Sequence, residues 1–312
     1  MRIVIIGQQA FGKAVLEAFA QRKDEVLGVF AAPEKAGARP DPLAAAATER
    51  GIPLYRFQRY SASEAQQALT ELKADLGVMA YVTLFAPPEF CAIPKGGMIQ
   101  FHPSLLPLHR GPSSISWAII RGRSETGISI FRPTPGLDEG PVILQKRVPI
   151  GPDDTAASLY FEKIFPQGVA ALLEAADLVA RGEARETVQD EEEATYEGWV
   201  REAESRINWA NHVDFVYDLI RGCNPSPGAW TTFRGQKLAL FDSRKSAAAT
   251  FAAVRGKKTG EVTALSAQGM RVLAQGGTIE VSRVCLGEGP KVAPSEAGIP
   301  EGAILGEEPL TR

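Results

Sequence analysis

The chain has little cysteine and no excess of positive charge. It carries only three cysteines, Cys91, Cys223 and Cys285, which are far apart and odd in number. This spacing excludes a disulfide framework and a zinc-ligand pattern, and it favours a reducing compartment. The formal charge of −3 lacks the basic balance typical of nucleic-acid-binding domains, although a local basic groove stays open as an alternative.

Long apolar runs are also missing. The N-terminal run over residues 3–6 is closed at once by Gly7, so it is too short for a signal peptide or a membrane span. We therefore expect a cytoplasmic protein that has no membrane partner. Hydrophobic residues make up 45% of the 312 residues and charged residues 23%, which is ordinary for a globular protein of one large or, more in keeping with the length, two domains.

Strand and helix patterns alternate over the first part of the chain. Residues 2–6, 25–30 and 76–80 are short apolar runs typical of buried strands, and amphipathic segments lie between them. Such alternation predicts an α/β fold, namely a Rossmann-like, mostly parallel sheet with helices on both faces.

The pattern changes near residue 200. Residues 190–204 are charged and lack a strand pattern, which indicates a linker. Short strands separated by turns follow at residues 229–233, 237–242, 260–265, 270–274 and 278–285. This spacing is typical of a small β-barrel, here expected to be OB-like. We thus expect a catalytic domain over residues 1–200 and a C-terminal β-barrel domain over residues 201–312.

A glycine loop follows the first strand. It runs from Gly7 to Ala14 and matches a phosphate-binding loop except at its last position, where Ala14 replaces the Ser or Thr that holds magnesium. The loop also lacks the second glycine of the dinucleotide fingerprint. We therefore expect a tight turn beside the active cleft, in which Phe11 either packs in the core or touches a substrate.

Two constrained loops carry polar residues suited to catalysis. His102 follows a strand at the carboxyl edge of the predicted sheet, where open α/β sheets place their ligands, and Pro103 stiffens its loop. Asp138 lies between Gly136 and Gly140 in a second loop. Taken alone, each has a plain structural explanation, since a single histidine is often structural and an aspartate often forms turns.

Taken together, these loops resemble the 10-formyltetrahydrofolate-dependent formyltransferase family. Residues 100–107 read QFHPSLLP and residues 137–140 read LDEG, similar to the family's Asn-x-His-x-Ser-Leu-Leu-Pro and Leu-Asp-x-Gly. Further passages, among them RINW at Arg206 and PGAW at Pro227, most resemble the N-terminal hydrolase domain of 10-formyltetrahydrofolate dehydrogenase, with a wider similarity to methionyl-tRNA formyltransferase.

The resemblance implies the catalytic roles. The reaction would move a formyl group through a tetrahedral intermediate, with His102 as oxyanion donor or proton shuttle and Asp138 holding the imidazole or ordering a water. Gln100 stands where the family has Asn. Its amide either reaches the formyl oxygen or points elsewhere; we favour the first, because the amide chemistry is kept.

The resemblance also implies where the ligands bind. Backbone groups of two loops would hold the pterin ring, at Val82, Thr83, Leu84, Phe85, Thr134, Pro135, Gly136 and Leu137. Besides Phe11, Arg110 is expected to meet the substrate, or else to pair with a carboxylate, and His109 is expected at the surface. The donor is then 10-formyltetrahydrofolate and the product tetrahydrofolate. We expect no metal and, because no aldehyde dehydrogenase domain is present in the sequence, no NAD(P).

The sequence does not identify the acceptor of the formyl group. A small amine and water are the two main alternatives, the second making the protein a 10-formyltetrahydrofolate hydrolase that releases formate. Residues 31–42 form a short segment of balanced charge, which argues against tRNA as a partner. A non-catalytic folate-binding protein is a further alternative, motivated by Gln100. The sequence does not indicate an oligomeric state.

Overall fold

The structure is a computed structural model that describes residues 1–22, 24–34, 37, 39–247 and 256–307. The chain forms two compact units that interleave along the sequence, here called the first and the second unit. The first unit comprises Met1–Gly111, Thr126–Val148 and Phe161–Tyr196, and the second comprises Pro112–Glu125, Pro149–Tyr160 and Glu197–Arg312. The division into domains at residue 200 stays a prediction.

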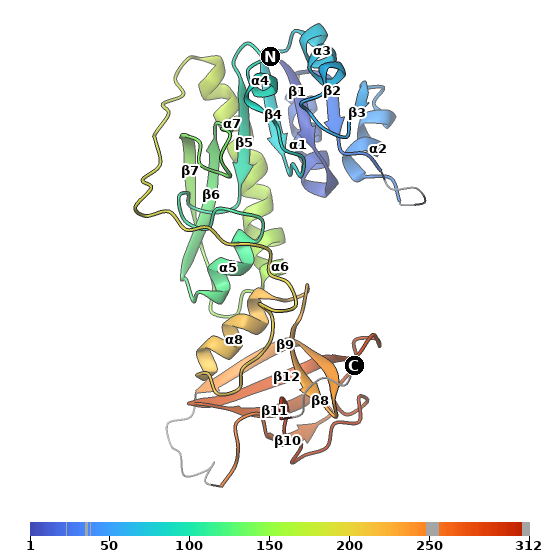
Figure 1. The fold of residues 1–312 in the computed structure, drawn as a ribbon, viewed down its shortest axis with the longest axis vertical. Coiled ribbons are helices and arrows are strands. Elements are labelled where there is room, and N and C mark those ends of the chain that lie inside the picture. The colour runs from blue at the N-terminus through green and yellow to red at the C-terminus, as the bar shows by residue number, and fades with distance from the viewer. Residues whose placement is uncertain (23, 35–36, 38, 248–255, 308–312) are drawn as a thin grey trace. The chain divides into compact units, whose positions relative to one another are not determined.

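The first unit contains a seven-stranded sheet in the order β3-β2-β1-β4-β5-β6-β7 (Figure 1). The strands are β1 (Arg2–Gly7), β2 (Glu25–Ala31), β3 (Leu54–Arg56), β4 (Leu76–Ala80), β5 (Met98–His102), β6 (Glu125–Phe131) and β7 (Val142–Pro149). The first five are parallel, and β6 runs antiparallel to β5. From β1 the chain first adds β2 and β3 on one side and then β4 on the other, so the strand order switches beside β1. Ligands bind at such a switch point in open α/β sheets.

Helices cover both faces of this sheet. They are α1 (Gln9–Gln21), α2 (Pro42–Glu49), α3 (Ser63–Leu72), α4 (Pro88–Cys91) and α7 (Phe165–Ala180), the last preceded by a π-helical turn at Leu159–Ile164. Met98 of β5 packs in one core with Leu69 of α3 and Phe90 of α4. Phe101 follows Met98 by three positions on β5, and because side chains alternate along a strand it points to the other face. There its ring lies 4.4 Å from that of Phe11 of α1. The predicted α/β class is confirmed.

The second unit contains a five-stranded antiparallel sheet in the order β10-β11-β12-β9-β8 (Figure 1). Its strands are β8 (Ala229–Phe233), β9 (Gln236–Ala247), β10 (Val262–Ser266), β11 (Gly269–Ala274) and β12 (Gly277–Leu286), and its helices are α5 (Ser114–Ile120), α6 (Ala156–Ser158) and α8 (Val213–Gly222). Apolar residues of α8 pack on the sheet, among them Val216 and Ile220. Among the described residues, none of the helices has the length and apolar character that crossing a membrane requires.

The segment interpreted as a linker is only partly one. Its beginning belongs to the first unit and is hydrogen-bonded there, because the Thr195 N–H donates to the Pro107 carbonyl at 3.2 Å and the Thr195 carbonyl accepts from the Arg110 N–H at 2.9 Å. The linker interpretation was therefore wrong for residues 190–196. Its charged residues favoured a linker, but one of them, Glu191, pairs with the buried Arg110 of the first unit.

Candidate functional site

His102 is the last residue of β5 and is almost fully buried. Its Nε2 lies 2.9 Å from the carbonyl oxygen of His109. Because a carbonyl can only accept, Nε2 must carry the hydrogen, and Nδ1 faces the other way. The loop after β5 is itself held, since the Ser104 hydroxyl donates to the Leu108 carbonyl at 2.6 Å. The orientation of the imidazole is thus set by backbone contacts.

Asp138 faces the free side of this imidazole. Its Oδ2 lies 3.5 Å from Nδ1 of His102 and accepts a hydrogen bond of 2.9 Å from the Gly111 N–H. Both side chains are buried. Asp138 has a φ of 57°, in the left-handed region that few residues other than Gly, Asn and Asp adopt. The structure thus brings the two predicted catalytic residues together as a buried acid–base pair that can hold or pass a proton.

The Asp138 loop depends on close backbone approach at a glycine. A Cβ at Gly140 would lie 1.6 Å from the Arg132 carbonyl oxygen, which belongs to the backbone and cannot move aside. A Cβ at Gly136 would meet the carboxylate of Glu139 instead, the end of a flexible side chain. Gly140 therefore determines the path of the loop.

Replacing Gly140 with alanine is expected to destabilise the protein by about 1–3 kcal/mol, the usual cost of overpacking. Thermal unfolding monitored by circular dichroism measures this loss. Gly198→Ala is the matched control, because nothing lies within 4 Å of the added methyl group and its backbone is not in the left-handed region. Equal melting temperatures for the two variants would contradict the expectation.

A cavity of about 300 Å³ lies next to Asp138, between the segments that follow β4 and β6. All eight positions predicted to hold the pterin line it, together with Gln100, Asp138, Met79, Ala86, Phe131 and Pro133. Its volume is at the lower end of the roughly 300–1,000 Å³ of small-molecule sites. His102 does not line the cavity, so its ring is connected to the cavity through Asp138.

Two polar side chains of the cavity have unused hydrogen-bonding capacity. The Thr134 hydroxyl is buried and has no partner among the residues that the structure describes. The Gln100 amide likewise makes no side-chain hydrogen bond within the described part of the chain, although it lines the cavity. A buried polar group without a partner is costly, so the Thr134 hydroxyl favours a polar ligand over an apolar one, and the partly buried Gln100 amide can also bind a polar group.

Arg110 is fully buried and makes five hydrogen bonds within the first unit. Its Nε and Nη2 donate to Oε1 of Gln189 at 3.0 and 2.8 Å, and it binds both carboxylate oxygens of Glu191 at 2.9 and 2.7 Å. Nη1 also donates to the Tyr196 hydroxyl. The hydrogen bond from Arg110 holds the pKa of Glu191 below its ordinary value. These contacts support the carboxylate-pairing alternative, and a substrate contact of Arg110 stays a prediction.

His109 and Phe11 are also buried. His109 was expected at the surface, and that was wrong, because its N–H is bound to the Thr195 hydroxyl at 2.7 Å and the residue is only 4% exposed. Phe11 packs between Phe101 and Phe165, which supports the core-packing alternative over a substrate contact. The glycine loop has a packing reason too, since a Cβ at Gly7 would lie 2.0 Å from the carbonyl oxygen of Ala80.

Gln189 was missed in the sequence. Its Nε2 donates to the carbonyl oxygens of Asp138 and Gly140 at 2.8 and 2.7 Å, so it contacts the backbone of the Asp138 loop directly. Glu191 and Tyr196 were missed for the same reason, namely that they belong to a charged segment interpreted as a linker. The passage ATYEG at Ala194, which resembles the hydrolase domain of 10-formyltetrahydrofolate dehydrogenase, is a signal that could have found them.

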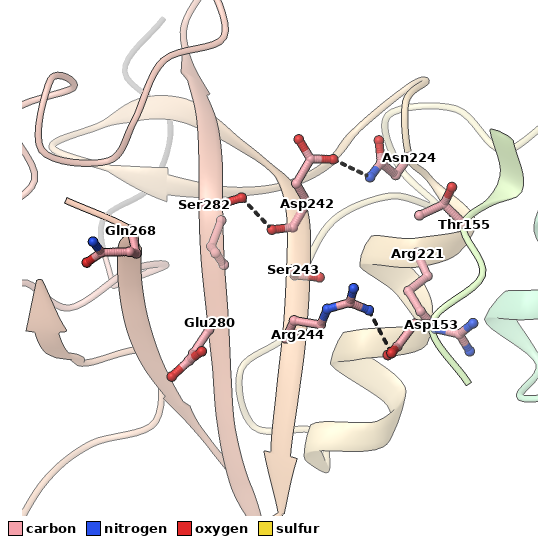
Figure 2. A pocket seen from close by; sticks show the side chains of 11 residues that line it. Asp153, Thr155, Arg221, Asn224, Asp242, Ser243, Arg244, Gln268, Glu280 and Ser282 are labelled. Atoms are coloured by element: carbon pink, nitrogen blue, oxygen red, sulfur yellow. Dashed lines mark hydrogen bonds and ion pairs between the residues drawn. The ribbon is translucent and has the colours of Figure 1, made fainter. Parts of the chain in front are cut away.

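A second cavity, of about 370 Å³, lies in the second unit (Figure 2). Its charged groups largely satisfy one another, since Arg244 pairs with Asp153 at 2.6 Å and Asp242 accepts from Asn224 at 3.1 Å. Neither His102 nor Asp138 lines it, whereas Asp138 lines the first cavity. Within the described residues, no group of three or more His, Cys, Asp or Glu side chains is arranged to hold a metal.

Comparisons with known proteins identify the family of the chain. Residues 1–175 match the family described as "Formyl transferase", and residues 200–297 match "Formyl transferase, C-terminal domain". Cytosolic 10-formyltetrahydrofolate dehydrogenase of Homo sapiens is 40% identical over 250 residues, which cover 78% of this chain but only 27% of that protein. Methionyl-tRNA formyltransferase of Marinobacter nauticus is 32% identical over 287 residues, or 90% of each chain.

A solved structure shares the fold. HypX from Aquifex aeolicus, determined in complex with tetrahydrofolic acid, aligns with a TM-score of 0.68 and 19% identity over 95% of this chain and 46% of that one. The chain thus spans about a quarter of the length of the dehydrogenase relatives and most of the length of the methionyl-tRNA formyltransferase. The family matches cover more than half of its residues. The chain is an enzyme that belongs to the formyl transferase family.

Proposed function

We propose that this enzyme takes the formyl group of 10-formyltetrahydrofolate and transfers it to an amine or to water. The observation that carries the proposal is the buried His102–Asp138 pair beside a cavity of about 300 Å³. The tetrahydrofolate complex of HypX supports a folate as the donor. The expectations that no metal and no NAD(P) take part, and that the protein is cytoplasmic, stay predictions.

The residues of the cavity fit a folate ring system. Residues 82–85 and 134–137 line the cavity on two segments, and their backbone N–H and C=O groups can match the donors and acceptors of a pterin edge without charged side chains. The unpartnered Thr134 hydroxyl adds a further polar group. Bound in this way, the donor would supply a formyl carbon next to Asp138, which lines the same cavity.

The acid–base pair suits attack on a formyl carbon. Attack places negative charge on the formyl oxygen and leaves a proton on the nucleophile, so the site needs a hydrogen-bond donor and a proton acceptor. The Asp138 carboxylate can accept the proton or order the nucleophile, and the His102 imidazole, held through Nε2, can share that proton through Nδ1. The bond between the formyl carbon and N10 of the folate then breaks, and the same proton passes to N10 of the leaving tetrahydrofolate. Gln100, which has an amide free to donate, is our candidate for the oxyanion.

The proposal leaves several candidates for the acceptor of the formyl group. Similarity to the dehydrogenase supports water, and similarity to methionyl-tRNA formyltransferase over 90% of both chains keeps an aminoacyl-tRNA among the candidates. The expectation against tRNA depended on residues 31–42, of which residues 35, 36 and 38 lie outside the described part. A folate-binding protein without catalysis is the remaining alternative.

Incubation with 10-formyltetrahydrofolate separates these alternatives. Tetrahydrofolate released without any amine, with formate in equal amount, indicates a hydrolase. Release that requires an amine indicates a transferase, and parallel reactions with an amino sugar and with methionyl-tRNA identify the acceptor class. Tight binding of tetrahydrofolate without turnover under any of these conditions would contradict the proposed reaction and leave a binding protein.

A further inference from the structure

The orientation of the Gln189 side chain is determined by a buried cation. Arg110 has five N–H donors, and all five are used: two by Oε1 of Gln189, two by Glu191 and one by Tyr196. Two donors of a guanidinium converge on the Gln189 oxygen, so the amide nitrogen of Gln189 must point away from Arg110. Both the guanidinium and the Gln189 amide are buried, which keeps water from competing for the two bonds between them.

The amide nitrogen of Gln189 holds the backbone on both sides of Glu139. Its Nε2 donates to the carbonyl oxygen of Asp138 at 2.8 Å and to that of Gly140 at 2.7 Å. Asp138 has a φ of 57°, in the left-handed region, which Asp enters more readily than most residues but less readily than Gly. Gln189 supplies two of the contacts that hold it.

The segment that carries Arg110 also contacts His102 and Asp138 directly, in addition to its contact with Asp138 through Gln189. The His109 carbonyl accepts from His102, and the Gly111 N–H donates to the Asp138 carboxylate at 2.9 Å. The side chain of Arg110, between these two residues, holds Gln189, which in turn holds the Asp138 backbone. One three-residue segment therefore contacts both members of the acid–base pair, and it reaches Asp138 from two sides.

We propose that Gln189 is a positioning residue, which transmits the placement of Arg110 to Asp138 and so sets the distance between Asp138 and His102. This inference rests on the proposed function for its kinetic consequence only. The role requires an acceptor and two N–H donors on the same terminal group, facing different partners, and among side chains of this length only the glutamine amide has both.

Two substitutions separate this role from simple packing. Gln189→Glu keeps the acceptor for Arg110, now as a charge-assisted bond, but it sets an oxygen against the Asp138 and Gly140 carbonyls. Gln189→Met keeps about the same side-chain volume and removes both the amide oxygen and the amide nitrogen. We expect each to lower kcat by about 10- to 100-fold, with KM for 10-formyltetrahydrofolate changed by less than about threefold, because misplacement near 1 Å at the reacting groups has effects of this order.

A second readout does not depend on the reaction. In protein labelled with ¹⁵N-glycine, the Gly111 amide reports on the Asp138 carboxylate, to which it donates. We expect its hydrogen exchange to quicken by about tenfold or more in both Gln189 variants, since a displaced acceptor leaves the amide open. Gln145→Met is the matched control, because Gln145 also donates to a backbone carbonyl, that of Leu106 at 2.7 Å, but does not contact the Asp138 loop.

The outcomes distinguish the positioning role from the proposed reaction. Unchanged Gly111 exchange in Gln189→Met and Gln189→Glu, relative to Gln145→Met, would overturn the positioning role, as would turnover within about twofold of the unsubstituted enzyme. If the unsubstituted enzyme does not turn over 10-formyltetrahydrofolate at all, the proposed function fails, while faster Gly111 exchange in the two variants still supports the placement of Asp138 by Gln189. A Gln189→Glu variant that retains the melting temperature but loses kcat supports the whole inference.

Discussion

Replacement of His102 with alanine is expected to slow turnover of 10-formyltetrahydrofolate by about 10²- to 10⁴-fold, the usual effect of removing an acid–base or oxyanion group. The imidazole is held by the His109 carbonyl at Nε2 and faces Asp138 at Nδ1, so no neighbouring described group can take over its proton transfer in the same geometry. Affinity for tetrahydrofolate should change little, because His102 does not line the cavity. Steady-state kinetics and calorimetric titration with tetrahydrofolate measure the two effects separately.

Two further variants make the His102 result interpretable. His102→Gln can keep the donor to the His109 carbonyl while it removes the ring, so a loss of turnover in this variant is not a loss of fold. His212→Ala removes a half-exposed histidine that caps α8 in the second unit, and it should leave turnover within about twofold of the unsubstituted enzyme. Turnover that survives in both His102 variants would exclude the imidazole from the chemistry.

Replacement of Asp138 with asparagine is expected to lower kcat by about 10²- to 10⁴-fold with the fold retained. Asparagine tolerates a left-handed backbone, so the φ of 57° at this position can persist, and its side-chain oxygen can still accept from the Gly111 N–H. What the substitution removes is the negative charge and the proton-accepting capacity next to His102. Alanine would be a poorer test, because it would also strain the backbone.

Asp242 supplies a matched control for Asp138. It also has a left-handed backbone, with a φ of 47°, and its carboxylate accepts a hydrogen bond of 3.1 Å from Asn224 in the second unit. Asp242→Asn is therefore expected to match Asp138→Asn in its small cost to stability but to keep kcat. Comparison of melting temperatures and kcat in the two variants checks this. Equal kcat for Asp138→Asn and the unsubstituted enzyme would remove Asp138 from the mechanism.

Gln100 is the position at which the motif around His102 departs from the family pattern. The motif around His102 matches the family except at this position, where the side chain is one methylene longer than the family's asparagine. The structure places Gln100 on the cavity wall, with an amide that has no partner among the described residues. This is the arrangement that the first of the two sequence-based readings requires, and its role as oxyanion donor stays a prediction.

The strands of both sheets could be predicted because periodicity reports on burial within one element. Residues 229–233 match β8 in full, and the predicted ranges for β10, β11 and β12 differ from the observed ones by only a few residues. His102 and Asp138 could be singled out as a candidate pair because glycine and proline constrain the two loops locally and because those loops resemble a known family. The antiparallel course of β6 beside β5 could not, since strand direction depends on which strands become neighbours.

The sequence by itself determined the α/β class and the small second sheet, and it singled out His102 and Asp138, whose side chains the structure places 3.5 Å apart. Only the tertiary structure decided that Arg110 and His109 are buried, and that Gln189 holds the Asp138 loop. The reason is sequence separation: Arg110 and Gln189 lie 79 positions apart, and Gln189 and Asp138 lie 51 apart. Local patterns report on burial within an element, whereas a buried polar contact between distant segments exists only once the sheet has brought them together.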